Sequence, residues 1–257
     1  QGDWSSDVCS SDLNDFYVAN LMAAFEKGTQ KLNLGFSYSN YLGDHFGTLI
    51  WAQNAGGALP NHQFYENKGE KTDTNVFAKL THAVGRQWTV YTDIQYRWID
   101  YKANGMQAGQ VPIDVNLNYG FFNPKAGVTF SMNPNHQLYF SVARAHKEPN
   151  RTDFENGNPL PEELTDFELG WRHQKSNLQF IVNAYFMDYT NQLVLTGAID
   201  EVGAPTRTNS GSSYRLGVEL ELSWMMSEQW QWQSNLSLSE NKNRDFFFER
   251  DGELPAL

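Results

Sequence analysis

Apolar and polar residues alternate one by one along much of the chain. The clearest example is SSYRLGVELELSW, residues 212–224. Its apolar row consists of Tyr214, Leu216, Val218, Leu220, Leu222 and Trp224. The positions between them hold Arg215, Gly217, Glu219, Glu221 and Ser223. Because successive side chains of a β-strand point to opposite faces, this pattern predicts a strand with one apolar and one polar face.

The same alternation predicts ten strands in all. A second clear example is WTVYTDIQYRW, in which Thr92 is the one small polar residue on the apolar face. No segment has the pattern of a long helix. The predicted strands cover residues 15–27, 32–42, 72–84, 88–101, 120–132, 137–147, 163–174, 178–195, 212–226 and 230–244.

The connections between the predicted strands alternate in length. Short turns are expected near residues 28–31, 85–87, 133–136, 175–177 and 227–229. Long polar connections are expected at residues 43–71, 102–119, 148–162 and 196–211. Short turns at one rim and long loops at the other are typical of outer-membrane β-barrels.

Two pairs of aromatic residues have the spacing of a membrane-spanning strand. Trp88 and Trp98 lie ten residues apart on one face, as do Tyr214 and Trp224. At about 3.3 Å per residue this is about 33 Å along the strand. For a strand tilted by about 40–45°, it projects to about 25 Å, the height of the apolar band between the aromatic girdles of a barrel. The sequence therefore predicts an all-β fold, an antiparallel transmembrane β-barrel.

Composition narrows the choice of partners. The mean hydropathy of −0.57 and the absence of a long apolar run argue against a transmembrane helix. They do not argue against a β-barrel, because apolar and polar residues alternate along its strands and the mean hydropathy stays low. The net charge of −11 argues against a nucleic-acid partner, which needs clustered Lys and Arg. A single cysteine excludes a disulfide framework within the chain.

The alternative fold is a soluble antiparallel sandwich or lipocalin-like barrel, because its strands alternate as well. In that fold the aromatic rows would form the core. Several predicted strands exceed 12 residues, whereas globular strands usually have about 5 to 6. Strand length and the asymmetry of the connections both favour the membrane barrel.

Residues 1–13 differ from the rest of the chain. QGDWSSDVCSSDL has no Lys or Arg and no apolar run, so it does not resemble a secretory signal. Its one cysteine has no histidine beside it, which makes a zinc site a poor explanation. Residues 3–13 are similar to the translation of a common short-read sequencing adapter. We therefore expect residues 1–13 to be an adapter artefact with no fold, and residues 14–257 to be a partial barrel domain.

Eight segments together resemble the barrel of TonB-dependent outer-membrane receptors. They are LGDHFGTLIWAQNAGG, GEKTDTNVFAKL, YTDIQYRWIDYKANG, FFNPKAGVTF, KEPNRTDFENG, EELTDFELGWRHQ, NAYFMDYTNQLVLTGAIDEVG and SSYRLGVELELSW. The resemblance covers nearly everything from Asn14 onward. It implies a barrel of about 22 strands closed by an N-terminal plug, and a short N-terminal segment that contacts the TonB complex.

The resemblance also implies what the whole protein does. Such receptors import a scarce or large ligand, namely an iron–siderophore complex, haem, cobalamin or a glycan, across the bacterial outer membrane. The expected partners are outer-membrane lipid, the ligand and the TonB complex, with no cofactor and no resident metal. This sequence contains no plug, no TonB-contacting segment and no signal peptide, so we expect it to be a piece of the barrel with about ten strands.

Candidate ligand-binding residues lie in the longest expected outer loop: Asp44, His45, Trp51, His62 and Tyr65. A mixture of aromatic and polar groups could hold a chelate or haem, although the two histidines lack the spacing of metal ligands. An ordinary hydrated loop is the alternative. The residues expected to face the lumen are Asp93, Arg97, Glu219 and Glu221.

Two other functions are open to an outer-membrane barrel, a passive porin and a barrel enzyme. An enzyme would need a nucleophile, a base and an orienting group close together. No Gly-x-Ser-x-Gly motif or paired acid and histidine stands out. The sequence therefore favours a transporter that is not an enzyme, without catalytic residues.

Overall fold

The structure is a computed structural model that describes residues 6–52, 59, 61–107, 112–154, 157–199 and 205–244. Within these ranges the chain forms twelve strands and one helix of four residues. In chain order the elements are β1 (Ser6–Lys27), β2 (Gln30–Ala52), β3 (His62–Val84), β4 (Trp88–Met106), β5 (Pro112–Asn133), β6 (His136–Lys147), α1 (Arg151–Phe154), β7 (Glu162–Lys175), β8 (Leu178–Thr190), β9 (Leu193–Ile199), β10 (Pro205–Asn209), β11 (Ser212–Ser227) and β12 (Trp230–Asn243).

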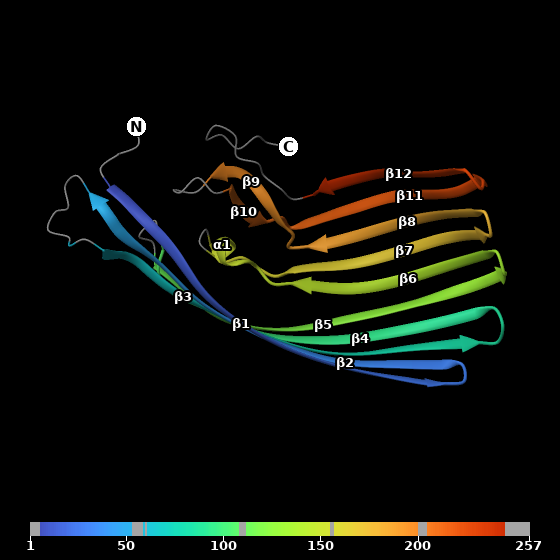
Figure 1. The fold of residues 1–257 in the computed structure, drawn as a ribbon, viewed down its shortest axis with the longest axis horizontal. Helices are drawn as coiled ribbons and strands as arrows, with labels where there is room; N and C mark the ends of the chain where they lie inside the picture. The colour runs from blue at the N-terminus through green and yellow to red at the C-terminus, as the bar shows by residue number, and fades with distance from the viewer. Residues whose placement is uncertain are drawn as a thin grey trace.

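Ten of the strands form one antiparallel sheet in the order β1-β2-β3-β4-β5-β6-β7-β8-β11-β12. Strands β9 and β10 form a separate hairpin between β8 and β11 (Figure 1). Each strand of the large sheet pairs with its neighbours in the sequence except at this insertion. The prediction of an antiparallel barrel sheet with ten strands is confirmed.

The tight turns lie together at one end of the sheet (Figure 1). Gly28 and Gly85 take positive φ angles of 60° and 65° in two of these turns. Only glycine enters this backbone region without a steric penalty, so these residues allow the chain to reverse within two or three positions. In a third turn the backbone N–H of Asn135 donates to Asn133 Oδ1 at 2.9 Å.

The large sheet has an apolar face that no other part of the described chain covers. Trp88 and Trp98 are each 47% exposed, and Leu169 is 57% exposed. Side chains of this size are normally buried in a soluble domain. On the other face of the same strands lie polar residues such as Asp93 and Arg97. This arrangement is that of a barrel wall whose apolar face meets lipid and whose polar face lines the lumen.

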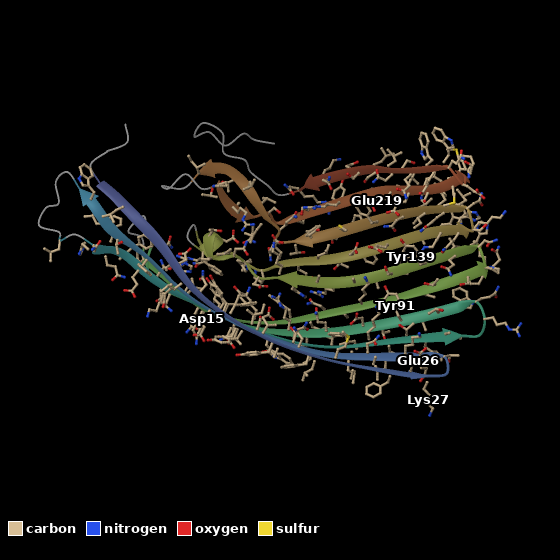
Figure 2. All side chains as sticks on the ribbon, in the orientation of Figure 1. Asp15, Glu26, Lys27, Tyr91, Tyr139 and Glu219 are labelled. Atoms are coloured by element: carbon tan, nitrogen blue, oxygen red, sulfur yellow. The ribbon has the colours of Figure 1, made fainter. Side chains whose placement is uncertain are left out.

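On the polar face, glycines lie opposite aromatic residues of the neighbouring strand. The directly opposed pairs are Tyr91 with Gly127, Tyr139 with Gly170 and Tyr185 with Gly217. Tyr91 and Tyr139 mark this row in Figure 2. A Cβ at Gly217 would lie 2.5 Å from the Tyr185 hydroxyl oxygen and 2.9 Å from the Leu238 carbonyl oxygen. Each ring therefore occupies the space that the absent side chain leaves.

Away from the tight turns, the strands extend further than the alternation predicts. Residues 43–71, predicted as a connection, instead continue β2 outward to Ala52 and bring β3 back from His62. Residues 102–119 likewise belong mostly to β4 and β5. β1 begins at Ser6 and pairs with β2 from there, which corrects the expectation that residues 6–13 have no fold. A strand beyond the apolar band needs no apolar face, so its ladder continues without the alternation that would reveal it.

The predicted strand 178–195 is interrupted. Asn191 takes a positive φ of 56°, a conformation that asparagine tolerates better than most residues. β8 ends at Thr190, and β9 begins at Leu193, before the predicted connection 196–211, and pairs with β10 within that connection. The described helix is only four residues long, and no helix in the described ranges is long and apolar enough to cross a membrane.

The sheet parts between β5 and β6. Their ladder ends at Lys125 opposite Ala143, although β5 extends outward to Pro112 and β6 to Lys147. Pro124, which has no backbone N–H to donate, directly precedes the last paired residue of β5. Beyond this point the two strands diverge (Figure 1), and the connection from β6 to β7 occupies the polar side of β4 and β5.

Candidate functional site: a charged cluster on the polar face

Four charged side chains meet on the polar face, at mid-length of β3 and β4 and level with the end of β6 that lies opposite the tight turns. Lys71 and Asp73 lie two residues apart on β3, and Arg97 lies on β4. The register places Asn75 opposite Arg97 and Asp73 opposite Ile99, so these side chains share one face. Glu148 follows the end of β6 and reaches Lys71 and Arg97 across β5.

Arg97 holds two carboxylates. Its Nη1 donates to Glu148 Oε2 at 2.9 Å and its Nη2 to Glu148 Oε1 at 3.0 Å. Its Nε donates to Asp73 Oδ2 at 2.9 Å, and its Nη2 also contacts Asp73. Lys71 Nζ donates to Glu148 Oε1 at 2.5 Å. Glu148 thus accepts a two-pronged contact from a planar guanidinium, the strongest geometry for such a pair, and a further bond from an ammonium group.

Glu148 is ionised in this arrangement. Its side chain is 8% exposed, and burial by itself would raise the pKa of the carboxyl group. The hydrogen bond from Lys71, the bond from its own backbone N–H and the charges of Arg97 and Lys71 outweigh burial and lower the pKa below its ordinary value. Glu148 lies beyond the last residue of β6, outside the membrane-spanning strands.

An apolar layer next to the cluster holds the connection from β6 to β7 in place. Ala103, Ile113 and Val115 are buried there, and the rings of Tyr101 and Phe154 lie 5.7 Å apart. These residues point to the polar side of the sheet, where buried apolar groups are unexpected. They are buried because α1 folds back over β4 and β5.

A second ion pair ties α1 to the small hairpin. Arg207 on β10 contacts Asp153 on α1, with Nε to Oδ1 at 2.8 Å and Nη2 to Oδ2 at 3.0 Å. The Asp153 side chain is 2% exposed. Its Oδ2 also accepts the backbone N–H of Asn150 at 2.7 Å. The β6–β7 connection and the β9–β10 hairpin are therefore linked through one buried carboxylate.

A third polar group lies where β5 and β6 part. His146 Nδ1 lies 2.8 Å from Asn123 Oδ1, and its ring stacks on Phe121 at 5.2 Å between centroids. Glu163 contacts Arg144 Nη2 at 2.5 Å and His146 Nε2 at 3.5 Å. These contacts bridge β5, β6 and β7 at the point where the β5–β6 ladder is missing.

The predicted ligand-binding residues do not form one cluster. Asp44 and His45 are neighbours on β2 and therefore point to opposite faces of the sheet. Asp44 Oδ1 lies 3.8 Å from Lys68 Nζ on β3, whereas His45 Nδ1 lies 2.7 Å from Asp12 Oδ1 on β1. Trp51 is at the outer end of β2 and 53% exposed.

His62 and Tyr65 lie at the start of β3. His62 is opposite Leu49 and Tyr65 is opposite Gly47, with an irregularity in the register between them. The five residues are therefore positioned by strands rather than by a loop, which corrects the expectation of a loop. Ligand binding by these residues stays a prediction.

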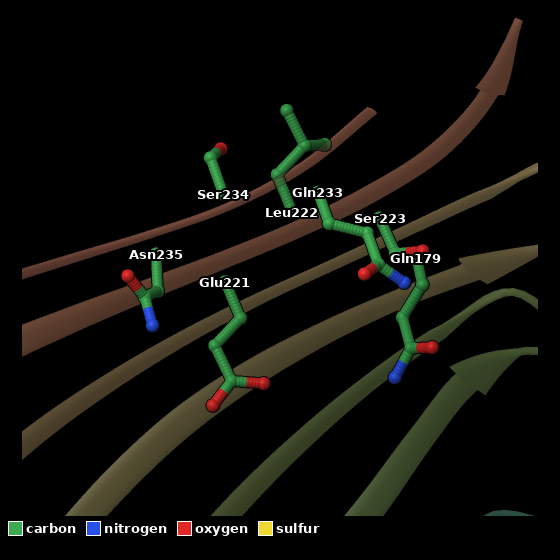
Figure 3. A pocket seen from close by; sticks show the side chains of 7 residues that line it. All are labelled: Gln179, Glu221, Leu222, Ser223, Gln233, Ser234 and Asn235. Atoms are coloured by element: carbon green, nitrogen blue, oxygen red, sulfur yellow. The ribbon is translucent and has the colours of Figure 1, made fainter. Parts of the chain in front are cut away.

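The residues predicted to face the lumen lie on the polar face. Arg97 belongs to the charged cluster described above, and Asp93 is half-buried opposite Lys125. Glu219, labelled in Figure 2, and Glu221 are both exposed on β11. Glu221 lines a shallow hollow of about 350 Å³ together with Gln179, Ser223, Gln233 and Asn235, while Leu222 points away from these residues (Figure 3).

Sequence reasoning missed Lys71, Asp73 and Glu148. A local signal existed for the first two, because positions two apart in GEKTDTN share one strand face. Glu148 gave no such signal, since its role depends on the β6–β7 connection crossing β5. Among the described residues, no group of three His, Cys, Asp or Glu side chains is placed to hold a metal ion.

Comparison with known proteins agrees with this geometry. Residues 3–255 match the family described as TonB dependent receptor-like, beta-barrel. The fold is similar to that of the copper transporter OprC, with a TM-score of 0.76 and 14% identity over 93% of this chain and 39% of that chain. The comparison with curated protein sequences finds no match.

Two bacterial siderophore-uptake receptors also have similar structures. The siderophore receptor PiuA from Acinetobacter baumannii has a TM-score of 0.68 and 16% identity over 96% of this chain and 41% of that chain. The ferric yersiniabactin uptake receptor FyuA from Yersinia pestis has a TM-score of 0.65 and 16% identity over 94% of this chain and 38% of that chain. The chain thus spans about two fifths of the length of the structures it matches.

The fold and its two contrasting faces define part of an antiparallel outer-membrane β-barrel. The family match then specifies which kind. The chain belongs to the TonB-dependent receptor β-barrel family.

Proposed function

We propose that the chain is part of a receptor that imports a scarce or large ligand across the bacterial outer membrane, driven through the TonB complex. The proposal rests on the family match together with the polar face, which carries the charged cluster. The ligand classes to consider are an iron–siderophore complex, haem, cobalamin and a glycan. The protein acts by non-covalent capture and movement of the ligand and is not an enzyme.

The test is uptake by cells that express the complete receptor. Labelled members of the four ligand classes are offered one at a time, with and without a protonophore that removes the energy source of TonB. We expect accumulation of one class only, and we expect the protonophore to abolish it. Accumulation that is equal in energised and de-energised cells would instead identify a passive porin.

For ligand contact we propose the residues at the outer ends of β2 and β3. Trp51 is exposed at the end of β2, and His62 begins β3 on the other side of the same connection. Replacing either residue with alanine should weaken binding of the imported ligand while leaving the barrel folded. Lys27→Ala, at the opposite rim of the sheet, is the matched control. Unchanged binding in both variants would remove these residues from the site.

For residues 1–13 we propose an origin outside the native gene, on the strength of their similarity to a sequencing adapter. Residues 14–257 are then the native part of the barrel domain. Reading the gene outward from the codon for Asn14 tests this directly. A native sequence different from DWSSDVCSSDL supports the proposal, and recovery of this same stretch from genomic DNA refutes it. In the first case Asp12, the partner of His45, is not a native residue.

A further inference from the structure

Glu148 is held by two cations that belong to a different part of the sheet. Lys71 and Arg97 come from β3 and β4, whereas Glu148 belongs to the connection between β6 and β7. Strand β5 lies between them and does not pair with β6 at this level. These contacts therefore hold the β6–β7 connection at a level where β5 and β6 are not paired.

Arg97 keeps one carboxylate partner without Glu148. Asp73 holds Arg97 through Nε, at 2.9 Å and 3.1 Å, and lies on the same strand face as Lys71. If Glu148 moved away, Arg97 Nη1 and Lys71 Nζ would lose their described acceptor. Lys71, Arg97 and Asp73 would then carry one net positive charge on a half-buried surface. Such a surface favours an anion that supplies the missing acceptors.

We propose that Lys71 and Arg97 form a binding site for a carboxylate or phosphate group of the imported ligand, and that Glu148 occupies this site until the ligand displaces it. The inference rests on the proposed uptake function and specifies a chemical group that the ligand carries. Displacement also frees the β6–β7 connection, so that binding of the anion and opening of this connection are coupled.

The exchange conserves the interactions of the cations. An incoming carboxylate can accept the same two bonds from Arg97 and the same bond from Lys71 that Glu148 accepts now. Glu148 returns to water, which avoids leaving a buried charge without a partner. The apolar contact between Tyr101 and Phe154 and the pair Asp153–Arg207 oppose the movement. Because Arg207 belongs to β10, the β9–β10 hairpin should move together with α1.

The experiment uses the complete receptor in lipid nanodiscs with a nitroxide label on the β6–β7 connection. Asn158 is exposed and lies between α1 and β7, so Asn158→Cys carries the label, in a receptor from which any other cysteine has been removed. Citrate and inorganic phosphate are the probes, and glucose and sodium chloride at matched ionic strength are the controls. Label mobility is read from the continuous-wave spectrum, and probe affinity is read by calorimetry.

In the parent protein, citrate or phosphate should raise the mobility of the label, and glucose and chloride should not. The probe that raises the label mobility shows whether the site accepts a carboxylate or a phosphate. Glu148→Gln should be mobile without any probe. If the closed form holds about nine tenths of the parent molecules, this variant binds the probe about tenfold more tightly. Arg97→Gln should be mobile and bind neither probe.

Glu163→Gln is the matched control, because Glu163 pairs with Arg144 and His146 on the neighbouring strand and not with the cationic pair. We expect its label mobility and probe affinity to equal those of the parent. Lys71→Gln guards against a folding defect in Arg97→Gln, since Lys71 is one-third exposed and should lose probe affinity while the barrel stays folded.

Two results would overturn the inference. If Glu148→Gln frees the connection but binds both probes no more tightly than the parent, Glu148 is only an anchor. If neither probe changes the label in the parent nor binds to Glu148→Gln, there is no anion site. These readouts need no TonB, so the anion site can fail while energised uptake is observed, and uptake can fail while the exchange is observed.

Discussion

Different interactions stabilise the two ends of the sheet. At the tight-turn end every strand pairs on both sides except the two edge strands, and aromatic rings fill the spaces over Gly127, Gly170 and Gly217. Toward the other end the ladders between β1 and β5 continue, but β5 and β6 separate, and long-range ion pairs and a small apolar layer replace the ladder between these two strands. Backbone ladders permit no rearrangement without loss of pairing. Side-chain contacts can be exchanged one for another, so the outer end is the part that can respond to a ligand.

The largest effect is expected from filling a glycine at the regular end. In Gly217→Ala the new methyl group meets the Tyr185 hydroxyl and the Leu238 carbonyl, which is a backbone atom and cannot swing away. Overpacking of this kind costs about 1–3 kcal/mol. The measurement is the free energy of unfolding of the complete receptor in urea, followed by the shift of the folded barrel on unheated gels.

Gly69→Ala is the matched control for this prediction. A Cβ at Gly69 would meet only Tyr41, at an ordinary distance of 3.9 Å. We expect the free energy of unfolding to change by less than about 0.5 kcal/mol. Equal destabilisation by both substitutions would show that the loss reflects alanine on a strand and not the occupied space.

A smaller and local effect is expected at the outer end. Arg97→Gln leaves the carboxylates of Asp73 and Glu148 facing each other without a guanidinium. After allowance for partial exposure, the local loss should be about 1–2 kcal/mol. Hydrogen exchange of residues 148–154 should accelerate, while exchange in β7 and β8 stays unchanged. A uniform acceleration across the sheet would contradict the division into a regular and an exchangeable end.

The strands at the regular end were predictable from the sequence, because lipid contact requires an apolar residue at every second position. Trp88 to Trp98 and Tyr214 to Trp224 show this requirement directly. Beyond the apolar band the requirement ends, which is why the alternation predicts a connection where the outer halves of β2 and β3 lie. The charged cluster could not be predicted as a whole. Glu148 reaches Lys71 and Arg97 only because β5 and β6 separate, and no local sequence pattern predicts that separation.

Acidification should act on the outer end alone. The pKa of Glu148 is lowered in the folded protein, so its stabilising contribution is complete above the ordinary glutamate pKa of about 4.3 and is lost as the pH falls through the lowered value. Lys71, Arg97 and Asp73 contact this group or its partner, and Tyr119 lies within its electrostatic reach. Opening of residues 148–154, corrected for the intrinsic exchange rate, should therefore increase below about pH 4. In Glu148→Gln the same residues should open equally at pH 4 and pH 6, and a persistent difference would assign the effect to another carboxylate.

The smallest effect is expected at Glu221, which tests whether charge alone matters on the polar face. Glu221 is exposed beside Gln179 and Gln233 and forms no ion pair within the described residues. Glu221→Gln keeps the shape of the side chain and should change the free energy of unfolding by less than about 0.5 kcal/mol. It should also leave the exchange of residues 148–154 unaltered. If this substitution loosened the β6–β7 connection as Arg97→Gln does, the outer cluster would be responding to the overall charge of the lumen wall. Its behaviour would then no longer follow from the contacts that Lys71, Arg97 and Glu148 make with one another.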